Sequence, residues 1–263
     1  IAEYGAECGM RALVLKCHFE STVGRAYNVS QQFEAIDVYG GITLNRYTGG
    51  INPVAVETSI RLGAKIIWMP TVDADHHAST YGFTGGYNTQ KSDSKPVEPL
   101  SIITNDGHLT QDCQDVLDIL AQYDTAALAT GHFSSDHVDI LVREAVKRGV
   151  KRIILQHVYF KIPGMKHEQV KSLTALPGVY AELEYCGISP FWAQPGQTFD
   201  LMHEGIIEVG AEHFILISDG GQRHNPLPPD GLRFLAQGFY EKCVTRDYLR
   251  TMMCLNPADV LRI

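Results

Sequence analysis

The sequence lacks the patterns that define several well-known classes of protein. No run of apolar residues approaches the length of about 20 residues that crosses a bilayer, and no signal peptide is recognisable at the start. The glycine motifs of dinucleotide-binding and P-loop proteins are absent, as is the G-x-S-x-G motif of serine hydrolases. No cluster of lysine and arginine stands out and the net charge is −8, so nucleic-acid binding is not expected.

The cysteines also lack a metal or disulfide pattern. All six are scattered, and no two form a C-x-x-C pair. A chain of 263 residues with 44% hydrophobic residues can bury a sizeable core without disulfides. We therefore expect free thiols and a cytoplasmic location. No linker, repeat or low-complexity tract divides the chain, so residues 1–263 are expected to form one domain.

Apolar segments bounded by glycine or proline alternate with helical patterns, and they have the character of buried parallel strands. The predicted strands are residues 11–18, 35–45, 64–73, 126–132, 152–160, 179–185 and 213–219. The clearest helix is 134–149, because Val138, Leu141 and Val142 share one helical face and Gly149 follows the last turn. Similar patterns predict helices at 52–63, 229–243 and 245–261.

One segment interrupts the alternation. Residues 74–111 are polar and rich in glycine, and residues 104–108 (TNDGH) have the composition of a hairpin turn. A loop of this length inside a compact domain is usually functional or mobile. We therefore predict a long loop insertion over about 74–111.

The alternation of strands and helices predicts the α/β class, and within it a (β/α)8 TIM barrel with strand 1 absent from this chain. Residues 1–9 read as a short helix that no strand precedes, so we expect strand 1 to lie upstream of residue 1. A doubly wound open sheet is the alternative fold. Such a fold commonly has a glycine-rich, phosphate-binding turn after an early strand, and no such turn is present.

Side chains that ligate metals stand at the ends of three predicted strands. His132 ends one strand, His157 lies near the end of the next, and Asp219 ends the last. Barrel active sites are built at the carboxyl ends of the strands, so these side chains should converge. A single histidine at a strand end is more often structural, but three such residues are less easily accidental. Two imidazoles and a carboxylate suit Zn²⁺ or a similar ion that activates water, with Asp219 accepting the proton.

Four segments resemble the amidohydrolase superfamily of metal-dependent barrel enzymes, in an uncharacterised branch: GGITLNRYTGGINPVAVE, GAKIIWMPTVDADHH, ATGHFSSDHV and SDGGQRHNPLPPDGL. The resemblance covers essentially the whole chain. That superfamily places a histidine after strand 5, a histidine after strand 6 and an aspartate after strand 8. The resemblance therefore implies that His132, His157 and Asp219 hold one or two divalent ions, zinc before manganese or iron.

The chain departs from that superfamily in one respect, because no His-x-His motif occurs in it. The superfamily carries this motif at strand 1, whereas Asp75, His76 and His77 have the wrong spacing and follow strand 4. Either the motif lies upstream of residue 1, or half of the metal site is missing. We favour the first explanation, because the opening helix independently indicates a missing strand.

Lys16 and His18 end the first predicted strand on the same side of it. Lysines of related enzymes are carboxylated and bridge two metals, usually from strand 4, so Lys16 could bridge in this way. It could equally bind a substrate carboxylate as an ammonium group, or form a simple salt bridge. His18 is expected to line the pocket, with a hydrogen-bonded wall residue as the alternative.

Further side chains are candidates for substrate binding. Trp68 could wall the pocket, and Asp73 begins the long loop. Arg223 and His224 follow the last strand, where Arg223 could clamp an anionic substrate or be a surface residue. Glu182 and Glu184 alternate on one strand and so face the same way, either inward toward a ligand or outward toward a helix.

These residues lead to three hypotheses. The first is a metal-dependent hydrolase in which activated water attacks an amide, lactone or related carbonyl of a small molecule. The second is a metal-dependent decarboxylase in which Lys16 or Arg223 holds the carboxylate. The third is a catalytically inactive barrel that binds a ligand. We expect the protein to bind a small-molecule substrate and to bind neither nucleic acid nor membrane. A homo-oligomer is compatible with the sequence.

Overall fold

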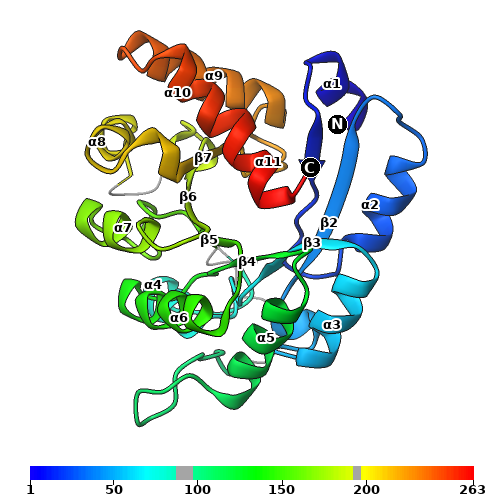
Figure 1. Ribbon diagram of the computed structural model, residues 1–263, viewed down its shortest axis with the longest axis vertical. Coiled ribbons are helices and arrows are strands. Elements are labelled where there is room, and N and C mark those ends of the chain that lie inside the picture. The colour runs from blue at the N-terminus through cyan, green and yellow to red at the C-terminus, as the bar shows by residue number, and fades with distance from the viewer. Residues whose placement is uncertain (87–96, 192–196) are drawn as a thin grey trace.

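A computed structural model of the chain describes residues 1–86, 97–191 and 197–263 (Figure 1). Seven parallel strands form one sheet, and each strand pairs with the next along the chain. They are β1 (Ala12–Val14), β2 (Asp37–Thr43), β3 (Ala64–Trp68), β4 (Ala127–Ala129), β5 (Ile153–Leu155), β6 (Val179–Glu184) and β7 (Phe214–Ile217). All seven predicted strands are thus confirmed, although each is shorter than the segment predicted for it.

The sheet curls into a half-barrel with helices around its outside (Figure 1). The helices that follow successive strands are α2 (Val23–Ser30), α3 (Pro53–Arg61), α5 (Gln111–Gln122), α6 (Ser135–Arg148), α7 (His167–Thr174), α8 (Phe199–Val209) and α9 (Pro228–Glu241). Within the described residues, β7 forms no backbone ladder with β1. The fold is therefore α/β and TIM-barrel-like, with seven strands in an open half-barrel, which is consistent with the predicted barrel that lacks one strand.

Local sequence explains where the predicted helices begin and end. The Ser134 hydroxyl accepts the His137 N–H at the start of α6, and Gly149 ends this helix with φ 93°. The Asn52 side chain caps α3 in the same way. The segment 245–261 is not one regular helix. It divides into α10 (Arg246–Arg250), a π-helical turn (Thr251–Leu255) and α11 (Asn256–Leu261).

The segment 74–111 is not a loop throughout, because it contains α4 (Asp75–Tyr81). Asp75 lies in the first turn, where its carboxylate interacts favourably with the positive end of the helix dipole, and Gly82 ends the helix with φ 84°. The polar sequence of α4 hides it from any search for apolar periodicity. The hairpin turn is confirmed, since Thr104 N–H donates to His108 O and Gly107 N–H to Thr104 O. Residues 87–96 of the predicted insertion lie outside the described residues.

The two sides of the curled sheet bury different residues. A large outer cluster lies between the sheet and the helices, and a smaller inner cluster includes Ile66, Trp68 and Ile154. Along β6, Ala181 and Leu183 belong to the outer cluster and Tyr180 packs against the inner one. Because side chains alternate along a strand, Glu182 and Glu184 point inward with Tyr180. The structure thereby decides between the two orientations that the sequence left open.

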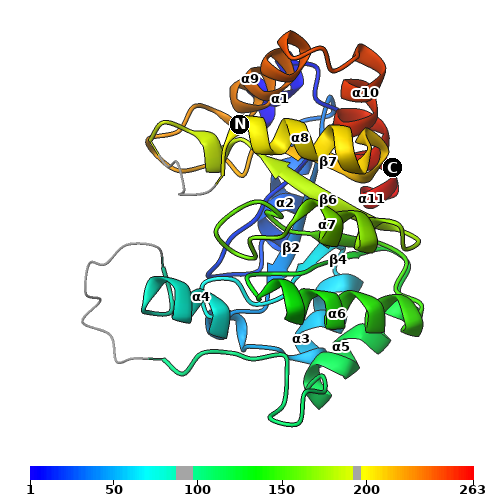
Figure 2. The same ribbon diagram turned by 90° about the vertical axis from the view of Figure 1, so that its left-hand side faces the viewer.

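The two ends of the half-barrel are covered differently. Figure 2 shows α4, which follows β3, on one side of the molecule and α11 with the C-terminus on the opposite side. Val260 and Leu261 of α11 join the inner cluster, and Lys65 Nζ near the start of β3 donates to Leu261 O over 2.7 Å. The amino ends of the strands are thus closed by the C-terminal segment, which leaves the carboxyl ends for a functional site.

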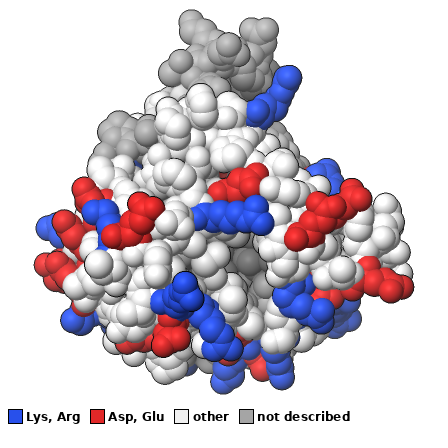
Figure 3. Space-filling model, turned by 90° about the horizontal axis from the view of Figure 1, so that it is seen from above, with Lys and Arg blue, Asp and Glu red and all other residues white. Residues whose placement is uncertain are grey.

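The surface carries charges of both signs. Acidic and basic side chains are interspersed over the face seen in Figure 3. Lys242 on the loop after α9 pairs with Asp200 on α8 at 2.5 Å, and Arg143 pairs with Asp139 within α6 at 2.8 Å. In the described part of the chain, no helix has both the length and the apolarity that a membrane span needs.

Candidate functional site

A tight turn places His132 directly after β4. Gly131 adopts φ 73°, and a Cβ atom there would lie 2.4 Å from Pro70 O, so only glycine fits without a shift of the backbone. The next residue, His132, donates its backbone N–H to the same Pro70 oxygen over 2.9 Å. The T-G-H sequence therefore fixes the start of the loop and directs the His132 imidazole, which is buried, toward the carboxyl ends of the strands.

His157 is held next to His132 by hydrogen bonds between two strand ends. Gln156 N–H donates to Thr130 Oγ1 over 3.1 Å, and Gln156 Oε1 accepts Gly131 N–H over 2.9 Å. The ring centres of His132 and His157 lie 5.7 Å apart as a result. Successive strands thus bring the two predicted imidazoles into one buried cluster.

Asp219 completes the group from the other edge of the sheet. Its Oδ2 lies 3.9 Å from His157 Nε2, and its Oδ1 lies 4.0 Å from Lys16 Nζ. Both Asp219 (φ 43°) and His157 (φ 47°) adopt left-handed backbone conformations. Residues other than glycine rarely do so, and such conformations concentrate at functional sites. Strain at two neighbouring candidate residues marks this end of the half-barrel as the site.

The protonation states suit metal ligation. Burial lowers the pKa of His157 to about 4 despite the opposing effect of Asp219, and burial lowers the pKa of His132 well below its usual value. Burial alone would raise the pKa of Asp219, but Lys16 and then His157 outweigh it, and the pKa falls below its ordinary value. At neutral pH the site therefore presents neutral imidazoles and an ionised carboxylate.

Glu182 and Glu184 add two buried carboxyl groups beside His157. Glu182 Oε2 lies 3.7 Å and Glu184 Oε2 lies 4.0 Å from His157 Nδ1. Burial raises the pKa of Glu182 to about 8, with Lys16 acting against it, and burial raises that of Glu184 well above its usual value. Among the described residues, Glu182 Oε2 and Glu184 Oε1 are buried with no hydrogen-bond partner. Such oxygens are costly unless a proton or a cation satisfies them.

A divalent cation fits these groups in ligand type and charge. The donors are imidazole nitrogens and carboxylate oxygens in the protonation states that bind metals. Glu182 and Glu184 keep their protons at neutral pH in the metal-free protein, so a cation would have to displace those protons before the orphaned oxygens could bind it. Within residues 1–86, 97–191 and 197–263, however, no three histidine, cysteine or carboxylate side chains are already gathered around one point as ligands. His157 Nε2 and Asp219 Oδ2, which are 3.9 Å apart, are one pair of donor atoms that an ion could bind between two strand ends.

Lys16, His18 and Trp68 lie at this site, as the sequence predicted for them. Lys16 Nζ lies 5.9 Å from the Trp68 ring centre, and Trp68 is buried in the inner cluster. His18 Nδ1 is 2.8 Å from Thr71 Oγ1, and the His18 ring centre is 6.3 Å from that of His132. The contact of Lys16 with Asp219 suits an ammonium group, and carboxylation of Lys16 stays a prediction.

The other predicted substrate-binding residues lie at the edge of the site or beyond it. Asp73 is buried, and its Oδ2 accepts the backbone N–H of Arg46 over 2.8 Å, which ties the loop after β3 to the loop after β2. Arg223 and His224 are exposed in the loop after β7. No salt bridge or hydrogen bond joins Arg223 to the candidates in the part of the chain that the structure describes. The roles of Asp73, Arg223 and His224 in substrate binding stay predictions.

Two residues outside the predicted set of ligands organise the site. Asn45 is fully buried after β2; its Nδ2 donates to His18 O and Thr71 Oγ1, and its Oδ1 accepts Thr71 N–H. His77, which the sequence grouped with the loop, is fully buried on α4 and lies against His132. A polar residue after an apolar strand was the one available signal for Asn45. For His77, the helix that carries it has no apolar pattern.

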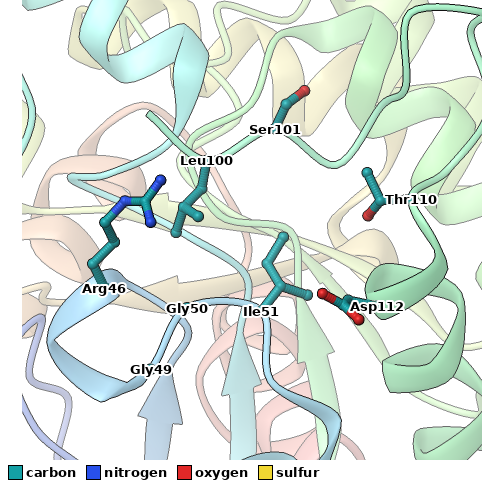
Figure 4. A pocket seen from close by; sticks show the side chains of 8 residues that line it. All are labelled: Arg46, Gly49, Gly50, Ile51, Leu100, Ser101, Thr110 and Asp112. Carbon is teal, nitrogen blue, oxygen red and sulfur yellow. The ribbon is translucent and has the colours of Figure 1, made fainter. Parts of the chain in front are cut away.

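A groove of about 390 Å³ lies outside the histidine cluster (Figure 4). Its lining residues are Arg46, Gly49, Gly50, Ile51, Leu100, Ser101, Thr110 and Asp112. They come from the loop after β2 and from the segment that leads into α5, and none is a candidate ligand. The groove therefore shares no residue with the candidate ligands at the strand ends.

Solved structures with a similar fold include an amidohydrolase from Pseudomonas aeruginosa, with a TM-score of 0.58 and 14% identity over 96% of this chain and 78% of that chain. A Xaa-Pro dipeptidase with bound methionine has a TM-score of 0.57 and 15% identity, and the match covers 100% of this chain and 66% of the dipeptidase. An N-acetyl-D-glucosamine-6-phosphate deacetylase from Mycobacterium smegmatis has a TM-score of 0.51 and 13% identity, and the match covers 96% of this chain and 65% of the deacetylase. The protein thus has an amidohydrolase-type, TIM-barrel-like fold.

The sequence itself identifies the family. The profile of the family of unknown function DUF6282 matches residues 1–182, so the chain belongs to that family. No curated protein matches the sequence. The chain spans about two thirds of the dipeptidase and of the deacetylase.

Proposed function

We propose that this protein is a metal-dependent hydrolase of the amidohydrolase type, which acts on an amide, lactone or related carbonyl of a small molecule. One observation carries the proposal: His132, His157 and Asp219, from three strand ends, form a group of two buried, neutral imidazoles and a partly exposed, ionised carboxylate. The amidohydrolase-type fold supports a hydrolase-like scaffold for this site, and the reaction itself is left for experiment.

His132, His157 and Asp219 would hold a divalent ion, zinc before manganese or iron, with Lys16 beside it as an ammonium group. Carboxylation of Lys16 is the alternative, in which Lys16 would be an anionic ligand and would no longer supply a positive charge. An ion bound there would polarise the substrate carbonyl and lower the pKa of water.

The protein's own groups then handle the proton. Asp219 is kept ionised by Lys16, 4.0 Å away, so it can accept a proton from the attacking water and return it to the leaving group. Its side chain is 31% exposed, whereas that of His157 is 4% exposed. Asp219 is therefore the member of the group that a substrate reaches first. Trp68, next to Lys16, and His18, next to His132, would line the pocket beside this group.

A decarboxylase on the same scaffold is the second candidate, and Lys16 is the observation that favours it. The Lys16 ammonium lies between the carboxylate of Asp219 and the face of Trp68, with 18% of its side chain exposed. An ammonium group in this position could hold a substrate carboxylate above an aromatic surface.

The test is a panel of lactones, simple amides, N-acyl amino acids and aromatic carboxylic acids, assayed with zinc and with manganese. We expect hydrolysis of at least one carbonyl substrate, and a loss of at least about 100-fold in Asp219→Asn with an unchanged circular dichroism spectrum. Release of carbon dioxide without hydrolysis would establish the decarboxylase instead. Undiminished turnover in Asp219→Asn would contradict the proposed role of Asp219, and no turnover of any kind would favour an inactive binding barrel.

A further inference from the structure

We propose that His77 is a positioning residue that holds His132 in the tautomer protonated at Nδ1, so that the Nε2 lone pair of His132 is the one offered to the site. The inference rests on the proposed metal site and assigns a residue to it that lies outside the three strand ends. His77 comes from α4, in the segment after β3, and is 55 residues away from His132 along the chain.

The two imidazoles meet in a hydrogen-bonding geometry. Their Nδ1 atoms are 3.1 Å apart, their ring centres 5.3 Å apart, and their planes differ by 18°. The difference between the two distances, 2.2 Å (5.3 minus 3.1), is about twice the distance from an imidazole nitrogen to its own ring centre. Both nitrogens therefore lie almost on the line between the ring centres. An in-line, nearly coplanar contact is the arrangement of an N–H donor facing an N lone pair.

The direction of this hydrogen bond follows from the far side of His77. His77 Nε2 lies 2.8 Å from Gly86 O, and a carbonyl oxygen can only accept, so Nε2 carries a proton. Neutral His77 then has its lone pair at Nδ1 and must accept the proton that His132 carries at Nδ1. The side chain of His77 is fully buried, and burial favours the neutral imidazole.

This chain of hydrogen bonds has a consequence for ligation. A carbonyl oxygen fixes one imidazole, which in turn fixes the tautomer and the ring orientation of the next, and such outer partners tune metal affinity. His157 also turns its Nδ1 toward buried groups, Glu182 at 3.7 Å and Glu184 at 4.0 Å, although these distances are too long for hydrogen bonds, and its Nε2 faces Asp219. Both imidazoles thus direct Nδ1 toward a buried partner. If His77 and His132 instead shared an ion through both Nδ1 atoms, the lone pairs would converge beside the N–N line and not along it.

Three variants of the full chain separate these possibilities. His77→Gln keeps an amide oxygen that can accept from His132 and an amide nitrogen that can donate to Gly86. His77→Phe keeps the ring shape and removes both hydrogen bonds. His76→Ala changes the neighbouring histidine of the same helix and serves as the matched control. Zinc dissociation constants are measured by competition with a chromophoric chelator, thermal unfolding reports on folding, and ¹⁵N imidazole spectra of the metal-free protein report the His132 tautomer.

We expect the wild type to carry the His132 proton at Nδ1. His77→Phe should weaken zinc binding by about 10–100-fold, whereas His77→Gln should stay within a few-fold of wild type and His76→Ala should be unchanged. A His132 proton at Nε2 in the wild type would overturn the inference, as would unchanged zinc affinity in His77→Phe. Loss of a bound ion from both His77 variants would make His77 a ligand and overturn it as well. If the wild type binds no zinc, the proposed metal site fails, and the spectra alone decide the role of His77.

Discussion

Lys16 and Asp219 connect the two edges of the half-barrel, with Lys16 Nζ 4.0 Å from Asp219 Oδ1. Lys16 follows β1 and Asp219 follows β7, and these strands share no backbone ladder among the described residues. A charge contact between side chains thus links strand ends that the sheet itself leaves apart. It also controls the ionisation of Asp219, because Lys16 is the first of the groups that lower the pKa of this carboxyl against the effect of burial.

Replacing Lys16 should therefore change the titration of Asp219. In metal-free Lys16→Gln we expect the pKa of Asp219 to rise above its wild-type value, because the lysine charge that opposes the effect of burial is gone. Carboxyl ¹³C chemical shifts measured against pH report the change. Lys147→Gln, an exposed lysine on α6, is the control and should leave Asp219 unaffected. An unaltered titration of Asp219 in Lys16→Gln would show that this contact does not set its ionisation.

Gly131 should tolerate no side chain. In Gly131→Ala the new Cβ would meet Pro70 O at 2.4 Å in a left-handed conformation, so we expect a loss of about 2 kcal/mol or more in the free energy of unfolding. Gly24→Ala is the matched control, because Gly24 lies in α2 with open space around it and should gain about 0.5 kcal/mol. Urea unfolding measures both, and equal stabilities of the Gly131→Ala variant and the wild type would refute this account of the turn.

Glu182 should make the stability of the metal-free protein depend on pH. Its pKa is about 8 in the folded chain against an ordinary value of 4.5, so between these values the folded state keeps a proton that the unfolded state has released. The free energy of unfolding must then fall as pH rises from about 4.5 to 8. Glu182→Gln removes this loss, and at pH 8 we expect it to be more stable than wild type by about 1–3 kcal/mol, with little difference at pH 4.5.

Thermal unfolding in the presence of a chelator tests that prediction at both pH values. The control is Glu204→Gln on α8, where the carboxyl is exposed and the difference from wild type should not vary with pH. A constant difference between Glu182→Gln and wild type across the range would mean that the buried carboxyl is already ionised in the folded protein.

The strands, and the clustering of the candidate ligands at their ends, could be predicted from the sequence because their signals are local. Apolar runs mark each strand, and a polar residue such as His132 or Asp219 at the end of a run marks the site edge. The direction of Glu182 required the inner and outer clusters to be known. His77 could not be placed, since its helix is polar and its partner lies 55 residues away. The role of Asn45 could not be predicted either, because Asn45 acts through hydrogen bonds to two other loops.

The most direct test of the central claim is the metal content of the protein, measured by elemental analysis after gel filtration of chain loaded with zinc or manganese. We predict about one or two equivalents of tightly held metal in the wild type, retained in His108→Ala, whose imidazole is exposed in the hairpin turn, and lost when His132 and His157 are both replaced by alanine. A wild type that holds no metal under these conditions, or a double variant that holds as much as the wild type, would contradict the assignment of this site.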